Sequence, residues 1–127
     1  MLNGDWIGRW GQAFSDKEAL VDVIENRRYT YGELAGDVHR LANYLHVGLG
    51  IGFGDRVACL SLNRADYIKL FFAISRLGAI LVPLNYRLTP LEFIYFLEDA
   101  APKAIFFDQT YENTVSQFKS KVHIPFY

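Results

Sequence analysis

The sequence predicts an α/β fold in which helices flank a parallel sheet, preceded by a short N-terminal β-hairpin. From Thr30 onward, helical patterns alternate with short apolar strands that carry almost no polar residues. Alternation at this spacing indicates parallel strands joined by right-handed crossovers. A hydrophobic content of 51% with 21% charged residues is typical of a folded chain. The 127 residues amount to one domain or less.

The first thirty residues predict a short helix and a hairpin. Residues 5–14 form the helix, and its apolar residues near helical spacing are Trp6, Ile7, Trp10 and Phe14. Residues 19–24 are largely apolar and predict a strand. A turn at residues 25–27 returns the chain as a second strand at residues 28–31.

Thr30 and Glu33 predict the start of the second helix. The Thr30 hydroxyl can accept from the Glu33 amide while the Glu33 carboxylate accepts from the Thr30 amide, which is a capping box. Gly48 and Gly50 are expected to end the helix. Its buried face should consist of Leu34, Val38, Leu41, Ala42 and Leu45, which lie three or four residues apart.

A helix is predicted at residues 65–77. In the sequence it lies between two apolar strands, at residues 56–62 and 79–84. Asn63 is the expected N-cap of that helix. The helix is apolar almost all the way round, so we expect it to be buried on more than one side. Pro83 indicates that the second strand lies at an edge of the sheet or ends there.

A third flanking helix is predicted from the run Thr89-Pro90-Leu91-Glu92, which combines an N-cap, a first-turn proline and a third-position glutamate. Pro102 should end it. Residues 104–108 then predict a further strand, and residues 111–119 a weaker helix. Residues 122–127 could begin one more strand.

Composition excludes several classes of function. A formal net charge of −1 and a pI of about 6.3 leave no basic surplus for nucleic acid. The single cysteine, Cys59, excludes an intrachain disulfide and lies in an apolar run that predicts an inert buried thiol. The N-terminus lacks a secretory pattern, and charges interrupt every apolar stretch well short of a membrane span. We therefore expect a cytoplasmic protein with no transmembrane segment.

Aromatic residues make up 16% of the chain, which is more than a compact unit of this size needs for its own core. We expect part of this surface to be covered, either by further chain or by a partner.

Most candidate sites have a plain structural explanation. Glycines 48, 50, 52 and 54 follow a helix and precede a strand, the reverse of the order in a phosphate-binding turn, so they predict a simple turn. His39 and His46 lie roughly 10 Å apart along one helix, which is too far for one metal ion. Ser61 and Asn63 end a strand without a His/Asp arrangement beside them and are expected to cap.

The ends of two predicted strands carry residue types that occur in binding and catalytic sites. Asp108 ends a strand where ligands often bind, but no second strand ends in the carboxylates that a magnesium-dependent phosphoacceptor needs. Asn85, Tyr86 and Arg87 follow another strand and offer an amide, a ring and a guanidinium. Such a loop can stack on a base or hold a phosphate, although a solvated loop with an Arg–carboxylate contact is the simpler interpretation.

Four motifs in fixed order give the chain a family resemblance. They are Tyr29–Leu34 (YTYGEL), Gly54–Ala58 (GDRVA), Leu77–Asn85 (LGAILVPLN) and Leu91–Asp99 (LEFIYFLED). Each is weak alone, but the ordered set resembles the N-terminal start of the adenylate-forming enzymes, which include acyl-CoA synthetases and aryl-CoA ligases. The pattern around Pro83 favours an acyl- or aryl-CoA ligase within that group.

The resemblance implies a larger parent enzyme that is an ATP-dependent acyl-CoA ligase. Such enzymes convert a carboxylate and ATP to acyl-AMP and pyrophosphate, then transfer the acyl group to CoA, and they use ATP, Mg and CoA. The family's phosphate loop, later Thr-Glu motif, hinge and C-terminal lysine have no counterpart in residues 1–127. We therefore expect an incomplete N-terminal portion of the large AMP-binding domain, without catalytic or metal-binding residues and inactive alone. The loop of Asn85, Tyr86 and Arg87 lies near the CoA nucleotide in some relatives, which implies contacts to that nucleotide.

Two other interpretations remain open at this point. The chain could be a non-catalytic α/β binding or assembly module that needs a partner subunit, or that self-associates through its apolar surface. It could also be a receiver-like or flavodoxin-like domain that uses Asp108. The sequence does not predict which carboxylic acid the parent enzyme activates.

Overall fold

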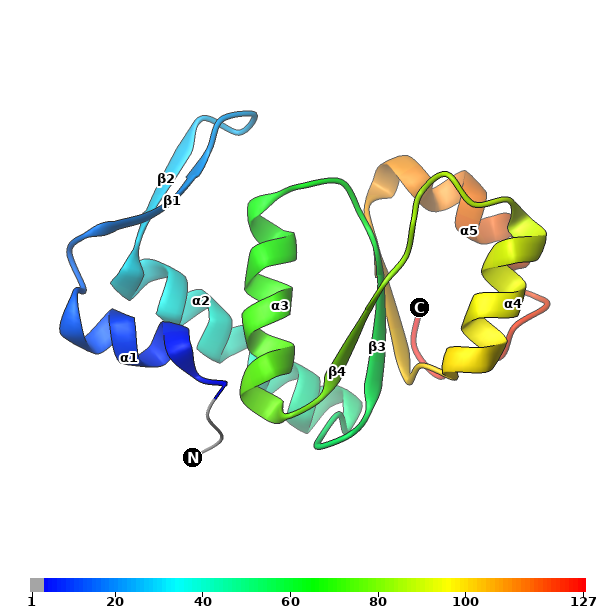
Figure 1. Ribbon diagram of the computed structural model, residues 1–127, viewed down its shortest axis with the longest axis horizontal. Coiled ribbons are helices and arrows are strands. Elements are labelled where there is room, and N and C mark those ends of the chain that lie inside the picture. Colours follow the sequence, from blue (N-terminus) through cyan, green and yellow to red (C-terminus); the bar gives the residue numbers. More distant parts are fainter. Residues whose placement is uncertain (1–3) are drawn as a thin grey trace.

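Strand β3 (Arg56–Leu60) is the centre of a three-stranded sheet, with β4 (Ile80–Pro83) on one side and β5 (Ala104–Phe107) on the other. The computed structural model describes residues 4–127 and is drawn in Figure 1. Both neighbours run parallel to β3, and Val57 lies opposite Leu81 on one side and Ala104 on the other. The predicted parallel sheet is confirmed.

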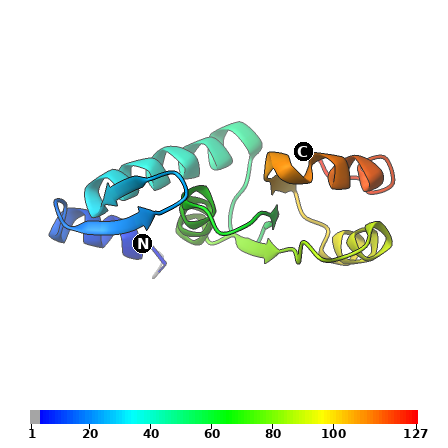
Figure 2. The same cartoon turned by 90° about the horizontal axis from the view of Figure 1, so that it is seen from above.

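Helices cover both faces of this sheet (Figure 1). Helix α3 (Ala65–Leu77) connects β3 to β4 on one face, and α4 (Pro90–Ala100) connects β4 to β5 on the other. Helix α2 (Tyr31–Asn43) packs beside α3, and α5 (Glu112–Phe118) lies beside α4. Figure 2 shows the same separation from above, with the α2 and α3 side at one end and the α4 and α5 side at the other.

The alternation of side chains along β3 divides the core into two clusters. Val57 and Cys59 face the cluster under α2 and α3, whereas Ala58 and Leu60 face the cluster under α4 and α5. All four side chains are buried, with at most 3% of each exposed. The sequence of β3 is almost entirely apolar because helices cover the sheet on both faces.

The predicted N-terminal elements are present. Helix α1 (Trp6–Ala13) precedes an antiparallel hairpin of β1 (Glu18–Asp22) and β2 (Arg27–Thr30). The first strand is shorter than predicted. Val23 and Ile24 lie in the turn with 83% and 85% of their surface exposed, because the Asp22 carboxylate accepts hydrogen bonds from the Ile24 and Glu25 amides and begins the turn early.

The predicted capping box at Thr30 and the predicted helix start at Thr89 are confirmed. The Glu33 amide donates to Thr30 Oγ1 at 3.2 Å and the Thr30 amide donates to Glu33 Oε2 at 2.9 Å, at the start of α2. Thr89 and Glu92 repeat the arrangement at the start of α4. Helix α2 continues into one π-helical turn, η1 (Tyr44–Gly48), before the chain leaves it.

The predicted cap of α3 is wrong. Arg64, not Asn63, occupies the N-cap position and makes no capping bond with its side chain. The Ala65 amide instead donates to Asp22 Oδ2 at 3.2 Å, so the tip of the hairpin supplies the cap.

One face of α3 is exposed within residues 4–127, with Ile68 at 37% and Phe71 at 46%, so the cover expected on that side does not come from this part of the chain. Two further predictions need correction. Strand β4 is only half-buried, since it is an edge strand, as Pro83 indicates. Near the C-terminus the expected strand is a single parallel bridge between Phe126 and Ala104.

Candidate functional site at the carboxyl edge of the sheet

Three loops meet at one edge of the sheet because the three strands are parallel. They follow the carboxyl ends of β3, β4 and β5, and begin at Ser61, Leu84 and Asp108 respectively. In open α/β sheets this edge is where ligands usually bind.

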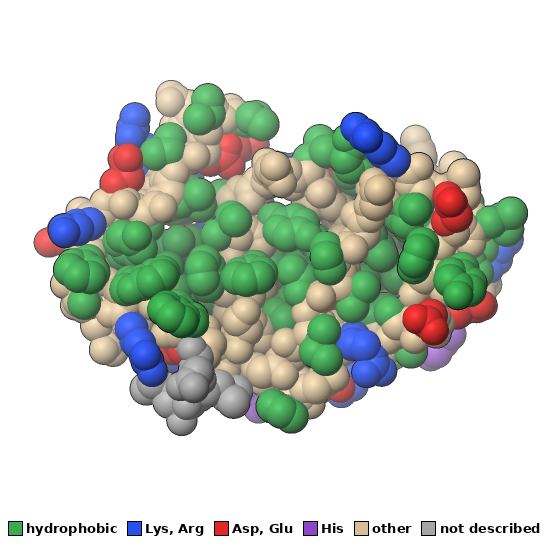
Figure 3. All heavy atoms as spheres, in the orientation of Figure 1, with side chains coloured by type: hydrophobic (Ala, Val, Ile, Leu, Met, Phe, Trp, Pro, Cys, Tyr) green, Lys and Arg blue, Asp and Glu red, His purple; other side chains and the backbone are tan. Residues whose placement is uncertain are grey.

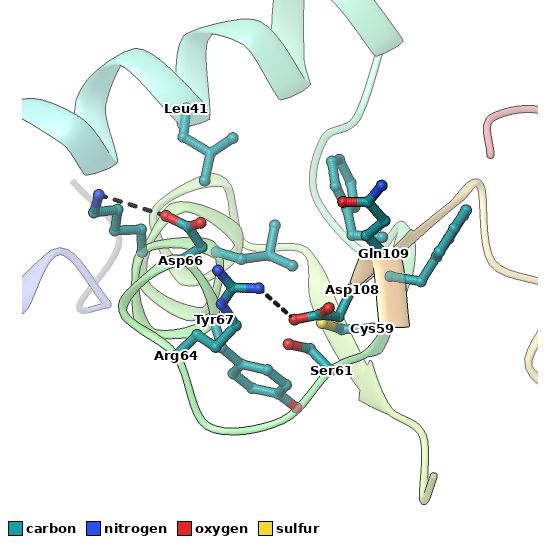
Figure 4. Close-up of a pocket in the computed structure, with 12 residues that line it drawn as sticks. Leu41, Cys59, Ser61, Arg64, Asp66, Tyr67, Asp108 and Gln109 are labelled. Atoms are coloured by element: carbon teal, nitrogen blue, oxygen red, sulfur yellow. Dashed lines mark hydrogen bonds and ion pairs between the residues drawn. The ribbon is translucent and has the colours of Figure 1, made fainter. Parts of the chain in front are cut away.

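A pocket opens at this edge, between the start of α3 and the ends of β3 and β5 (Figure 4). Its volume is about 360 Å³. The walls are mostly apolar, and the polar residues that Figure 4 labels around it include Ser61, Arg64, Asp66, Asp108 and Gln109. A mostly apolar pocket with a few polar groups is the kind of site that small molecules use.

An ion pair fixes the polar side of this pocket. Arg64 Nη1 donates to Asp108 Oδ2 at 2.6 Å, and Arg64 Nη2 lies 3.2 Å from Glu25 Oε1 in the hairpin turn. Only 6% of the Asp108 side chain is exposed. The bond from Arg64 and further bonds from Thr110 lower the pKa of Asp108 to about 2. Arg64 therefore joins the hairpin, α3 and the end of β5.

Asp108 also caps the short 3-10 helix η2 (Gln109–Tyr111). Its Oδ1 accepts from the Thr110 amide at 3.0 Å and from the Thr110 hydroxyl at 2.8 Å. Both carboxylate oxygens are thus engaged. Among residues 4–127, no group of three His, Cys, Asp or Glu side chains is placed to hold a metal ion. The phosphoacceptor interpretation of Asp108 does not fit this arrangement.

Two potential nucleophiles line the same pocket without a base to activate them. Burial raises the pKa of the Cys59 thiol to about 11, and only 3% of the residue is exposed, as the sequence predicts for an inert thiol. The Ser61 hydroxyl donates to the Leu62 carbonyl at 2.8 Å. The expected role of Ser61 and Asn63 as helix caps is not what the structure shows, since Asp22 caps α3.

The loop of Asn85, Tyr86 and Arg87 lies at the same edge but outside the Asp108 pocket. All three residues are exposed. Asn85 Oδ1 accepts from the Arg87 amide at 3.0 Å, and the Arg87 guanidinium lies 5.5 Å from the centre of the Tyr86 ring. No carboxylate pairs with Arg87 in the described chain, so the expected Arg–carboxylate contact is absent here.

The structure adds Tyr111, which sequence reasoning assigned only to a helix. Its ring centre lies 6.2 Å from that of Tyr86, with the two planes inclined at 31°. An aromatic residue shortly after a predicted strand end was the available signal, but the meeting of the two rings depends on how the loops fold.

The histidines take no part in this site. His46 lies in η1, and its Nδ1 is 2.9 Å from the Ile51 carbonyl oxygen. His39 is exposed on α2, and His123 is exposed near the C-terminus.

Comparison with known proteins decides the family. Residues 7–125 match the family described as AMP-binding enzyme. The chain belongs to this family. The resemblance read from the four motifs is therefore confirmed, and the receiver-like interpretation is excluded.

The relatives of this AMP-binding chain include several CoA ligases. It is 31% identical over 117 residues to 4-hydroxybutyrate–CoA ligase 2 of Metallosphaera sedula, a match that covers 92% of this chain and 21% of that protein. It is 37% identical over 106 residues to the long-chain-fatty-acid–CoA ligase of Thermus thermophilus, covering 82% of this chain and 19% of that protein. The chain thus spans about a fifth of the length of the curated relatives it matches.

A solved structure shows the same fold. The fatty acyl CoA synthetase of Mycobacterium tuberculosis superposes with a TM-score of 0.89 at 29% identity, and the match covers 98% of this chain and 25% of that one. The α/β architecture around β3 is therefore that of the adenylate-forming enzymes.

Proposed function

We propose that this chain is the N-terminal portion of an ATP-dependent acyl-CoA ligase. The whole enzyme would convert a carboxylate and ATP to acyl-AMP and pyrophosphate, and then form a thioester with CoA. The observation that carries the proposal is the match of residues 7–125 to the AMP-binding family, together with relatives that are CoA ligases.

Within that enzyme, the proposed task of residues 4–127 is to support and position, not to catalyse. Asp108 is held by Arg64 and Thr110, and Cys59 and Ser61 have no base beside them. The described residues also offer no three-ligand group for the Mg²⁺ that accompanies ATP. We therefore expect the chain alone to be inactive.

The contribution to ligand binding that we propose is a contact with the nucleotide of CoA. Asn85, Tyr86 and Arg87 are exposed and lie at the carboxyl edge of the sheet. A ring can stack on the adenine, and a guanidinium without a carboxylate partner can pair with a phosphate. The residues present therefore fit the nucleotide of CoA better than they fit Mg²⁺.

An ATP–pyrophosphate exchange assay tests the proposal that this chain alone is inactive. The purified chain is incubated with ATP, Mg²⁺, labelled pyrophosphate and a panel of short, long and aromatic carboxylic acids, with the Thermus thermophilus ligase as the positive control. We expect background rates from the chain with every acid. Acid-dependent exchange above background would show that residues 1–127 contain catalytic groups, against the proposal.

A second candidate function, an assembly module, has one observation in its favour. Hydrophobic side chains gather over α1 and α3 on the face shown in Figure 3, and Trp6, Phe14, Ile68 and Phe71 are each at least 37% exposed. A surface of this kind on an otherwise folded chain marks a contact with other protein. A monomeric chain that binds no hydrophobic dye in light-scattering and fluorescence measurements would exclude this candidate.

A further inference from the structure

The hairpin of β1 and β2 is held differently at its base and at its tip. At the base, only 5% of Tyr29 is exposed, and the Lys69 ammonium lies 4.5 Å from the centre of its ring. At the tip, Val23 and Ile24 are exposed. A two-stranded sheet is only marginally stable by itself, so the contacts of the tip decide how firmly the hairpin stays in place.

Apolar packing does little to hold the tip against α3. A groove of about 350 Å³ lies between them, with Val21 and Ile24 on the hairpin side and Tyr67 and Ile68 on the helix side. Figure 1 shows the hairpin projecting from the rest of the molecule beyond the start of α2. Side chains that face an open groove lose contacts on that side, so polar bonds have to hold the tip.

These polar bonds reach the start of α3. The Ala65 amide donates to Asp22 Oδ2 at 3.2 Å, and Arg64 Nη2 lies 3.2 Å from Glu25 Oε1. The Glu25 side chain is 57% exposed, so its ion pair with the guanidinium is weak by itself. The tip, residues 22–25, is therefore attached by bonds that can open locally while both core clusters stay intact.

The same guanidinium is held more firmly on its other side. Arg64 Nη1 donates to Asp108 Oδ2 at 2.6 Å, and only 6% of the Asp108 side chain is exposed. That carboxylate also caps η2 by accepting from the Thr110 amide. One planar guanidinium thus joins an exposed carboxylate of the hairpin to a buried carboxylate at the carboxyl edge of the sheet.

We propose that the hairpin is a strap whose tip is fastened to the carboxyl edge by Arg64, so that the tip and the η2 cap stabilise each other. The base around Tyr29 and Lys69 is the fixed end, and residues 22–25 are the end that opens. Any molecule in the carboxyl-edge pocket then meets a guanidinium whose position the hairpin sets. The strap does not depend on the proposed function, because all its contacts lie within residues 4–127.

Amide hydrogen exchange of the 127-residue chain tests the strap, because each end has a reporter amide. Asp22 protects the Ala65 amide at the tip, and Asp108 protects the Thr110 amide at the edge. Asp108→Asn should speed exchange at Ala65 about threefold or more, which lies within the range for side chains of one ion-pair network. Glu25→Gln should speed exchange at Thr110 by a similar factor, because coupling between two sites is reciprocal.

A matched variant separates this coupling from a general loss of stability. Rates are expressed relative to the slowest amides of β3, which report global unfolding. Asp55→Asn also removes a carboxylate that pairs with a cation, Lys103 at 2.8 Å, but it lies at the opposite end of β3. It should leave the relative rate at Ala65 unchanged. An Ala65 rate that is the same in wild type and Asp108→Asn, or that Asp55→Asn raises equally, would overturn the strap.

Two substitutions of Arg64 show whether the coupling passes through its guanidinium. Arg64→Lys keeps the charge but replaces the planar fork with a single ammonium, and Arg64→Met removes the charge. In either background, Asp108→Asn should change the relative rate at Ala65 by less than about twofold, as for independent sites. An undiminished effect in both backgrounds would show that Arg64 is not the link.

The comparison remains decisive if a variant loses its fold, which circular dichroism reports. Arg64→Lys then replaces Arg64→Met, because it retains the charge. Glu25→Gln, at an exposed residue, replaces Asp108→Asn, with Thr110 as its reporter. A Thr110 rate unchanged by Glu25→Gln would equally overturn the strap.

Discussion

The Asp108 carboxylate bonds to Arg64 at the start of α3 and to Thr110 in η2, so one side chain joins elements that are far apart in the sequence. Its pKa of about 2 lies below the usual value of 3.8, because both bonds favour the ionised form. The carboxylate is therefore ionised at neutral pH.

This lowered pKa predicts an acid-dependent loss of stability. A carboxylate with a depressed folded-state pKa contributes fully above its unfolded pKa, near 4, and the contribution is lost as the pH falls towards about 2. Asp108→Asn should lower the free energy of unfolding at pH 7 by about 1–3 kcal/mol, as for other hydrogen bonds to charged groups. The difference from wild type should shrink at pH 3. Urea unfolding at both pH values measures it.

Other carboxylates with a lowered pKa make the wild type and Asp108→Asn both sensitive to acid. The informative quantity is therefore the difference in free energy of unfolding between these two proteins. These carboxylates are Asp22, Asp37, Asp55 and Glu92. Glu98→Gln, on the exposed side of α4, serves as the control and should change little. An Asp108→Asn difference that is the same at pH 7 and pH 3 would contradict the assigned ion pair.

Cys59 gives a second prediction at the scale of one residue. Its pKa of about 11, against a usual value of 9.0, reduces the thiolate fraction on the order of a hundredfold at pH 8. Alkylation by iodoacetamide should therefore be at least that much slower in the native chain than in urea. Equal alkylation rates in the native and the urea-unfolded chain, measured by mass spectrometry, would show that the Cys59 side chain is not buried under α3.

Local signals made the starts of α2 and α4 predictable, whereas a helix cap or ring contact that depends on residues far apart in the sequence was not. The caps at Thr30 and Thr89 each lie within a four-residue motif, so the sequence alone locates them. The cap of α3 comes from Asp22, 43 positions away, and no local pattern reports it. The meeting of Tyr86 with Tyr111 has the same origin, because it depends on the order of the strands in the sheet.

The capping box of α2 gives a prediction at the scale of an element. Thr30→Ala removes the acceptor of the Glu33 amide and should destabilise the chain by about 1 kcal/mol. Ser116→Ala in α5 is the matched control, since that hydroxyl donates to the Asn113 carbonyl of its own helix. Chemical unfolding of the three proteins measures the effect. A Thr30→Ala variant as stable as Ser116→Ala would mean that the box does not hold the helix start.

Across the whole molecule, the sheet has a helical layer on each face, but α3 is still exposed on its outer side. The sequence predicts that this side is covered by further chain, and within residues 4–127 Phe71 is 46% exposed. Figure 3 shows apolar side chains of the same face extending over α1. The helical pattern alone could not separate contacts made within these residues from contacts that further protein would make.

The exposed side of α3 predicts measurable association. Phe71→Lys should lower hydrophobic-dye fluorescence and self-association while leaving the fold intact, because the side chain is half outside the core. Leu91→Lys is the control, since Leu91 is 76% exposed on α4, on the opposite face of the sheet. Light scattering and dye binding should respond to the first variant and not to the second. Equal responses would show that the α3 face is not a contact surface.

The most direct test of the central claim replaces the matching segment of the Thermus thermophilus long-chain-fatty-acid–CoA ligase with this chain. The match covers 106 residues at 37% identity, so both cores should be retained. A chimera shown to be folded by circular dichroism is assayed for acyl-AMP and acyl-CoA formation. We predict both products, because the remainder of the ligase supplies the catalytic groups. A folded chimera that forms neither product would contradict the assignment of this chain to a CoA ligase.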